Sequence, residues 1–155
     1  RRESQVELLK KQGAKIVLNS TDSHFAKELK DACKEQKAFL AFDAVAGPLT
    51  MQILGAMPNH SKVTVYGGLS SEAAQAEPGQ LIFQDKSIDG FWLTSWLGKK
   101  NVVQSIQFWQ RAQKLLTTDL KSEIRSTYPL ADVQKAVAAY QQQMTGGKIL
   151  LKPEE

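Results

Sequence analysis

Short apolar segments alternate with amphipathic segments along this chain, and that alternation constrains its fold more than any other feature. The apolar segments are residues 16–18, 38–42 and 63–66. Each has the length of a strand and is bounded by polar or glycine residues. The segments between them, 23–36 and 48–57, carry apolar residues at helical spacing. Apolar strands separated by helices predict an α/β fold, in which helices cover both faces of a parallel sheet.

The pattern changes after Tyr66. Residues 70–80 are small and polar and predict a surface loop, which an extended segment from Ile88 to Leu93 follows. Asn101 is suited to cap a long amphipathic helix. A strand at 123–128, a helix at 130–144 and a strand at 148–152 then complete the prediction.

Composition excludes several classes of protein. With 42% hydrophobic and 23% charged residues among 155, the chain is typical of a globular protein. The net charge of +4 does not indicate nucleic-acid binding, because Lys and Arg are spread among acidic residues. No apolar run approaches the roughly 20 residues of a membrane span. Cys33 is the single cysteine, so we expect no intramolecular disulfide and a reducing, cytoplasmic setting.

No catalytic constellation is recognisable in the sequence. His24 and His60 are the only histidines, and neither has the spacing of a metal ligand, so we interpret both as solvated residues. Cys33 lies on the apolar stripe of its helix and is expected to be a buried small hydrophobe. No glycine-rich loop precedes a helix, so the dinucleotide fingerprint is missing.

Position still indicates where a ligand would bind, because ligands of open α/β sheets bind beyond the carboxyl ends of the strands. Those ends are Asn19-Ser20, Asp43 to Gly47, and Tyr66 to Leu69. The glycines there permit either a close ligand or a tight turn, and we weigh the two equally. Asp43 is suited to hold a hydroxyl group or to cap the next helix, and capping is favoured.

Five segments in order resemble the medium-chain dehydrogenase/reductase superfamily from the end of its second cofactor-domain strand onward. They are "RRESQVELLKKQGAKIVLNSTD", "FLAFDAVAG", "SKVTVYGGLS", "KSIDGFWLTSWL" and "YPLADVQKAVAAYQQQMTGGKILLKP". Among its members the chain is most similar to the zinc-independent quinone oxidoreductases and enoyl reductases. The resemblance implies NADP(H) bound to a Rossmann domain, a separate substrate domain, and hydride transfer to a small molecule: a quinone, an enone or an enoyl thioester.

The resemblance also implies cofactor-binding residues by position. Arg1 and Arg2 fall where relatives bind the adenosine 2′-phosphate, although solvated terminal arginines remain the alternative. Ser20 falls on the adenine side. The loops that line the ribose groups correspond to Val45, Ala46 and Gly47, and to Tyr66, Gly67 and Gly68. Phe91, Trp92 and Leu93 match the backbone stretch that meets the carboxamide, although the Trp92 side chain favours a core or interface position.

The chain departs from the family because the first Rossmann strand and its glycine-rich turn are absent. The N-terminus has neither an initiator Met nor an apolar leader, so we interpret it as a chain that begins midway. We expect residues 1–93 to be the second half of an NADP(H)-binding Rossmann domain, and 94–155 to be the returning part of the substrate domain. Alone, the chain should bind NADPH poorly and be inactive, because the turn that holds the pyrophosphate is missing.

The same resemblance implies the oligomeric state and the cellular location of the parent protein. We expect a homodimer through the extended segment from Ser87 to Leu93. The location is cytoplasmic, or mitochondrial if a targeting segment lies upstream. The alternative function is a non-catalytic member of the superfamily that binds nucleotide or partner proteins. Catalytic residues are not identified, and no metal is expected.

Overall fold

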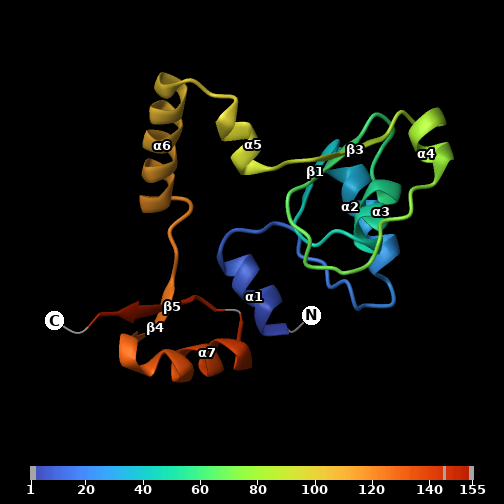
Figure 1. The fold of residues 1–155 in the computed structure, drawn as a ribbon. Helices are drawn as coiled ribbons and strands as arrows, with labels where there is room; N and C mark the ends of the chain where they lie inside the picture. Colours follow the sequence, from blue (N-terminus) through green and yellow to red (C-terminus); the bar gives the residue numbers. More distant parts are fainter. Residues whose placement is uncertain (1–2, 145, 154–155) are drawn as a thin grey trace. The chain divides into compact units, whose positions relative to one another are not determined.

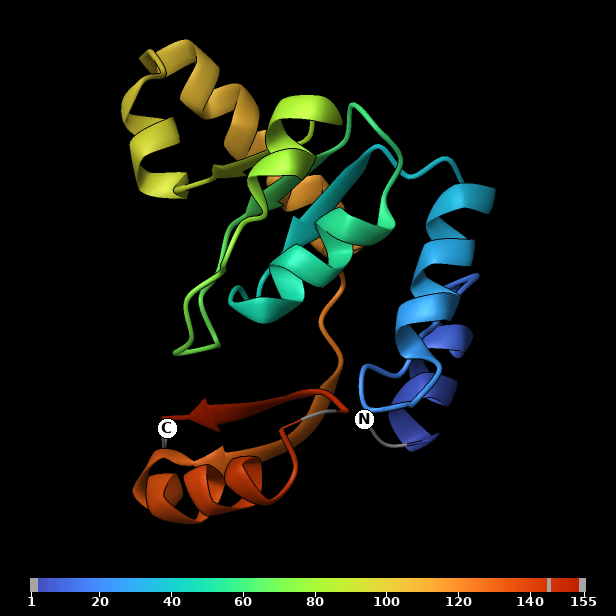
Figure 2. The same cartoon turned by 90° about the vertical axis from the view of Figure 1, so that its right-hand side faces the viewer.

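The computed structural model describes residues 3–144 and 146–153, and these residues form two compact units (Figures 1 and 2). The first unit comprises residues 14–99, and the second comprises residues 3–13 together with those after Lys99. No helix in the described part of the chain is long and apolar enough to cross a bilayer.

A three-stranded parallel sheet organises the first unit. Its strands are β1 (Leu40–Asp43), β2 (Lys62–Val65) and β3 (Ser87–Gly90), and they lie in that order. Leu40 pairs with Lys62, and Val63 with Ile88. Helix α3 (Pro48–Ala56) connects β1 to β2, and α4 (Pro78–Phe83) connects β2 to β3. The predicted α/β fold class with a parallel sheet is therefore confirmed.

The core of this unit lies between the sheet and two helices, α2 (Phe25–Glu35) and α3, which pack against each other (Figure 1). Leu54 on α3 and Val63 on β2 are both fully buried. Cys33 on α2 joins them, as the apolar stripe of that helix predicted. Pro48 occupies the first turn of α3, where its missing N–H costs no hydrogen bond.

The predicted buried strand at residues 16–18 is wrong. These residues run without regular secondary structure, and the Ile16 side chain is 43% exposed. A strand needs a hydrogen-bonded neighbour, and no described segment pairs with this one. Apolar composition alone therefore predicted a strand in a segment that has no strand to pair with in the described chain.

The prediction that β1 is buried on both faces is also wrong. Its side chains alternate, with Asp43 only 3% exposed on the face toward the helices, while Phe42 on the other face is 68% exposed. Successive strand residues point to opposite faces. The described part of the chain therefore covers one face of the sheet and leaves Leu40 and Phe42 uncovered.

Two further boundaries differ from the prediction. The expected loop 70–80 ends in α4, where Pro78 again starts a helix. The extended segment to Leu93 stops earlier, because β3 ends at Gly90 and α5 (Leu93–Gly98) begins at Leu93. The Trp92 side chain is 71% exposed, so of its two predicted positions the core is wrong, whereas the interface stays a prediction.

The second unit contains a two-stranded parallel sheet of β4 (Ile124–Pro129) and β5 (Lys148–Lys152), against which α7 (Val133–Gln142) packs (Figure 1). A short 3-10 turn, η1 (Leu130–Asp132), leads into α7. Helices α1 (Glu3–Lys11) and α6 (Val102–Thr117) belong to the same unit. Asn101 caps α6 as predicted, and the strands at its C-terminal side are confirmed.

Candidate functional site

The loops that follow β1, β2 and β3 emerge at one edge of the first unit, because the three strands are parallel. Backbone hydrogen bonding between neighbouring strands continues one residue past the last residue of β2 and of β3. The N–H of Tyr66 donates to the carbonyl of Asp43 at 2.9 Å, and the N–H of Phe91 donates to the carbonyl of Val65 at 2.8 Å. The loop bases are therefore tied to the sheet and to one another.

Asp43 holds the loop between β1 and α3. Its Oδ1 accepts the N–H groups of Val45 at 2.8 Å and Ala46 at 3.1 Å, and its Oδ2 accepts the Thr50 hydroxyl at 2.6 Å. Burial alone would raise the pKa of this carboxyl, but the three hydrogen bonds outweigh burial and lower it. Asp43 thus organises the loop as a buried carboxylate. The favoured capping role is wrong, because the N–H groups that Asp43 accepts precede the first residue of α3, and the hydroxyl that it holds belongs to Thr50.

The two glycine-containing loops touch each other. A Cβ atom on Gly47, whose φ is +71°, would lie 2.6 Å from the Ser70 hydroxyl oxygen. A Cβ atom on Gly67 would lie 2.6 Å from the carbonyl oxygen of Ala44. The N–H of Ser70 also donates to the Val45 carbonyl at 2.7 Å. These glycines permit loop-to-loop packing, whereas nothing lies within 4 Å of a Cβ on Gly68.

A hollow of about 550 Å3 lies between these loops and the first turn of α3. Its lining residues are Ser20, Val45, Ala46, Pro48, Leu49, Gln52, Leu69, Ser70 and Glu72. The volume lies within the range of small-molecule sites. A second hollow of about 510 Å3 shares Pro48, Gln52 and Glu72 with the first.

The structure brings together only some of the residues that the sequence placed at a cofactor. Ser20, Val45 and Ala46 line the hollow, whereas Gly47 and Gly67 do not line it but allow the two loops beside it to approach each other closely. Tyr66 is 55% exposed at the same edge. The residues that follow β3, which include Phe91, Trp92 and Leu93, do not line the hollow; Phe91 instead packs on Trp96, with ring centroids 6.2 Å apart. Arg1 and Arg2 lie outside the described residues.

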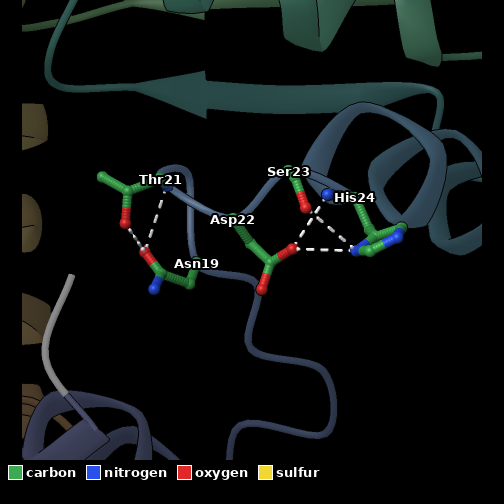
Figure 3. A network of polar contacts seen from close by, with 5 residues as sticks. All are labelled: Asn19, Thr21, Asp22, Ser23 and His24. Atoms are coloured by element: carbon green, nitrogen blue, oxygen red, sulfur yellow. Dashed lines mark hydrogen bonds and ion pairs between the residues drawn. The ribbon is translucent and has the colours of Figure 1, made fainter.

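The segment beside Ser20 is a polar turn (Figure 3). Asn19 Oδ1 accepts the N–H of Thr21 at 3.1 Å and its hydroxyl at 2.9 Å. Asp22 Oδ1 accepts the N–H of His24 at 2.8 Å, and this bond lowers the pKa of Asp22. Ser23 Oγ and His24 Nδ1 lie 3.2 Å apart. These contacts are all local, so they order the entry to α2 without forming a catalytic arrangement.

The titratable groups elsewhere fit their expected structural roles. The His24 and His60 side chains are 76% and 74% exposed, and His60 Nδ1 lies 2.9 Å from Asp85 Oδ2. Burial raises the pKa of the Cys33 thiol, and the charge of Lys86 offsets only part of that rise. Within residues 3–144 and 146–153, no group of three or more His, Cys, Asp or Glu could hold a metal ion.

Sequence reasoning missed Gln52, Ser70 and Glu72 as lining residues. Gln52 lies one helical turn after Pro48, so helical spacing could have placed it at the same end of α3. Ser70 and Glu72 belong to an irregular loop whose path no periodicity predicts. Only the structure shows that this loop folds back over Gly47.

Comparisons with known proteins agree with this architecture. A family model described as zinc-binding dehydrogenase matches residues 1–111. The mitochondrial enoyl-[acyl-carrier-protein] reductase of Dictyostelium discoideum is 25% identical over 152 residues, which are 96% of this chain and 43% of that protein. This chain thus spans less than half the length of that relative.

Two solved structures share the fold over nearly the whole chain. One is a Mesorhizobium loti protein assigned as an NADPH:quinone reductase, with 36% identity and a TM-score of 0.84 over 99% of this chain and 44% of that one. The other is the Etr1p/NADP/crotonyl-CoA complex, with 24% identity and a TM-score of 0.72 over 98% of this chain and 45% of that one.

Proposed function

Because the chain belongs to the zinc-binding dehydrogenase family of oxidoreductases, as the match over residues 1–111 shows, we propose that it is part of an NADPH-dependent reductase. The proposed acceptor is a quinone, an enone or an enoyl thioester. The observation that carries the proposal is the hollow at the carboxyl ends of β1 and β2. That is where α/β sheets of this kind bind nucleotides.

The walls of the hollow suit a nucleotide. Asp43 fixes the loop that carries Val45 and Ala46, so these residues present a fixed wall. Gly47 and Gly67 allow the two loops to approach closely. We propose that Ser20, Val45, Ala46 and Gly47, with Tyr66, Gly67 and Gly68, surround the sugar and adenine groups of the cofactor. When bound, NADPH supplies the hydride.

Three positions complete the proposed cofactor site. Phe91, Trp92 and Leu93 follow β3 at the same edge of the sheet, where their backbone is proposed to meet the carboxamide. Arg1 and Arg2 are proposed to bind the 2′-phosphate, which a guanidinium fork suits. No residue of the described part of the chain is proposed to hold zinc, because it contains no cluster of potential metal ligands.

The names of the similar proteins support the proposed class of hydride acceptor. One relative is an enoyl-[acyl-carrier-protein] reductase, one structure holds NADP and crotonyl-CoA, and another is assigned as an NADPH:quinone reductase. All of these acceptors are activated double bonds that accept a hydride at carbon or oxygen. The residues that would select among them are proposed to lie mostly outside this chain.

The organisation of the parent protein is also a proposal. We assign residues 1–93 to the second half of the cofactor domain and 94–155 to the substrate domain. We propose a homodimer through the segment from Ser87 to Leu93. Strand β3 is the edge of the described sheet, and an unpaired edge with exposed apolar residues invites pairing with a second copy. A cytoplasmic or mitochondrial location fits such an enzyme.

The test uses the longer protein that contains this chain and the missing glycine-rich turn. Loss of reduced-nicotinamide absorbance should depend on crotonyl-CoA or on a quinone, and NADPH should be preferred over NADH. Binding of NADPH without turnover of either acceptor would favour the non-catalytic alternative. No binding of either nucleotide would contradict the proposal.

The 155-residue chain alone is the control for NADPH binding by the longer protein. It should bind NADPH poorly, because the pyrophosphate-binding turn is absent. Replacing Arg1 and Arg2 by Ala in the longer protein should remove the preference for NADPH. An unchanged ratio of NADPH to NADH affinities would show that these arginines do not discriminate.

A further inference from the structure

The loop between β1 and α3 is anchored to a buried hydroxyl group. Thr50 lies in the first turn of α3 and is 1% exposed, and Asp43 at the end of β1 is 3% exposed. The Thr50 hydroxyl donates to Asp43 Oδ2 at 2.6 Å. Thr50 does not line the hollow beside this loop, so its hydroxyl acts on a ligand there through Asp43 and not by contact.

The two oxygens of Asp43 hold different parts of the chain. Oδ2 accepts the Thr50 hydroxyl, whereas Oδ1 accepts the N–H groups of Val45 at 2.8 Å and Ala46 at 3.1 Å. Torsion restricts an aspartate carboxylate only weakly, so a bond to one oxygen is needed to fix the direction of the other. Burial raises the pKa of Asp43, and the bond from Thr50 is the strongest of the three that lower it overall. The Thr50 hydroxyl therefore orients the carboxylate that holds the loop.

The loop depends on this hold because its backbone is strained. Ala46 has a φ of +65°, and Gly47 follows with a φ of +71°. Glycine adopts such angles freely, but they cost free energy in a residue with a Cβ atom. Strained conformations persist where the surrounding contacts impose them. The bond from the Ala46 N–H to Asp43 is such a contact, so a carboxylate that turned away would release the loop from its present path.

We propose that Thr50 is a positioning residue of the cofactor site. Its hydroxyl orients Asp43, which keeps Ala46 in the left-handed conformation and so presets the wall that Val45 and Ala46 give to the hollow. The inference rests on the proposed nucleotide function, since it assigns that wall to the cofactor. A preset wall binds a ligand without the entropic cost of ordering the loop. Thr50 therefore affects the affinity for the cofactor and not the rate of hydride transfer.

The first test measures the loop itself, by amide hydrogen exchange at Val45 and Ser70 in the 155-residue chain. The N–H of Val45 donates to Asp43, and that of Ser70 donates to the Val45 carbonyl. Thr50→Val removes the hydroxyl and should speed exchange at both groups at least about tenfold, which corresponds to about 1.4 kcal/mol. Thr50→Ser keeps a hydroxyl and should restore slow exchange.

A matched control removes a different buried hydroxyl from the same unit. Ser61 is also 1% exposed, and it directly precedes β2, at the opposite edge of the sheet from the loop. Its hydroxyl donates to the Pro58 carbonyl. Ser61→Ala should therefore leave exchange at Val45 and Ser70 unchanged.

A second substitution isolates the strain. In Ala46→Gly the left-handed conformation no longer carries a penalty, so the loop should keep its path without the Thr50 hydroxyl. The double variant Thr50→Val/Ala46→Gly should exchange more slowly at Val45 than Thr50→Val alone. Lys37 also has a positive φ, +50°, but it follows α2. Lys37→Gly should therefore give no rescue of Thr50→Val.

The second test uses NADPH and the longer protein that contains this chain. Thr50→Val should raise the KM for NADPH about tenfold and leave kcat nearly unchanged, because the variant loses binding without losing contacts to the reacting atoms. Thr50→Ser should restore the KM, and so should Ala46→Gly in the Thr50→Val background.

The outcomes separate this inference from the proposed function. Unchanged exchange in Thr50→Val, or no rescue by Ala46→Gly, would overturn the positioning role even if the longer protein is a reductase. Faster exchange with an unchanged KM would show that this loop does not hold the cofactor, and the inference would fail while hydride transfer stood. If the longer protein binds no nicotinamide nucleotide, the proposed function fails, and the assignment of Thr50 to a cofactor site fails with it.

Discussion

Helices α3 and α6 differ in how they are held, although both begin at the residue that the sequence predicted. Helix α3 has nine residues, and Leu54 on it is fully buried against α2 and β2. Helix α6 has sixteen residues, yet none of them is buried, and Ile106 and Trp109 are each 52% exposed. Helix α3 is therefore held by packing, and α6 mainly by its own local interactions.

The local interactions of α6 are visible at its first turn. Asn101 Oδ1 accepts the N–H of Gln104 at 2.9 Å, and Gln104 Oε1 accepts the N–H of Asn101 at 3.2 Å. This reciprocal capping box satisfies two N–H groups that helical bonding leaves free. The comparison teaches that start signals determine where a helix begins, whereas burial depends on a surface supplied from elsewhere in the chain or by a partner.

The largest expected effect comes from truncating a buried side chain on α3. Leu54→Ala should lower the free energy of unfolding of the first unit by about 2–5 kcal/mol, because it leaves a cavity in the core. The matched change on the exposed helix, Ile106→Ala, should cost less than about 0.5 kcal/mol. Urea denaturation followed by circular dichroism measures both. Similar losses for the two variants would show that α6 is as tightly packed as α3.

A smaller effect is expected where the loops of the packed unit meet. Gly67→Ala places a methyl group against the Ala44 carbonyl oxygen and should cost about 1–3 kcal/mol, because backbone must move. Gly68→Ala is the neighbouring control, since its added Cβ meets nothing within 4 Å. Denaturation midpoints measure the difference. Equal midpoints for both variants would contradict the close approach of the two loops.

Much of the fold could be predicted because its signals are local. Pro48 and Asn101 mark helix starts through their own chemistry, and the stripe ending at Cys33 gives the buried face of α2. The burial of the apolar strand segments could not be predicted in the same way. Residues 16–18 have the composition of a strand, but no described segment pairs with them. The exposed face of Phe42 has the same cause, since composition does not say which surface will cover it.

The candidate site was predictable only as a position. Parallel strands place their carboxyl ends together, so Val45 and Ala46 could be assigned to one edge before the structure was known. Ser20 also lines the hollow, although the strand that was predicted to precede it does not form in the described chain. The contribution of Ser70 and Glu72 could not, because it depends on the fold of an irregular loop over Gly47. The role of Asp43 as the acceptor that holds its own loop was not predicted, because the sequence suggested only a cap for the next helix or a partner for a hydroxyl group.

The pH dependence of the packed unit should report on Asp43. Its hydrogen bonds lower its folded pKa below the ordinary 3.8, so the stability it contributes is present above that value and is lost as pH falls through the folded pKa. Asp43→Asn should cost about 1–2 kcal/mol at neutral pH by weakening charge-assisted bonds. The difference in the free energy of unfolding between this variant and the unmodified chain should disappear at acidic pH. Urea denaturation from neutral to acidic pH measures it, with the exposed Asp31→Asn as control; a gap independent of pH would contradict this account.

The smallest expected effect concerns the cap of the exposed helix. Asn101→Ala removes the side-chain acceptor of the capping box and should destabilise α6 by about 1 kcal/mol. Because packing contributes little there, most of that loss should appear as faster amide hydrogen exchange at Gln104 and Ser105, whose N–H groups donate to Asn101, while the exchange of α3 stays unchanged. Gln110→Ala is the control, since it alters an exposed position within α6 and leaves the cap intact. If exchange in α6 were unaffected by Asn101→Ala, a contact other than its cap would hold this helix, and the contrast with α3 would fail.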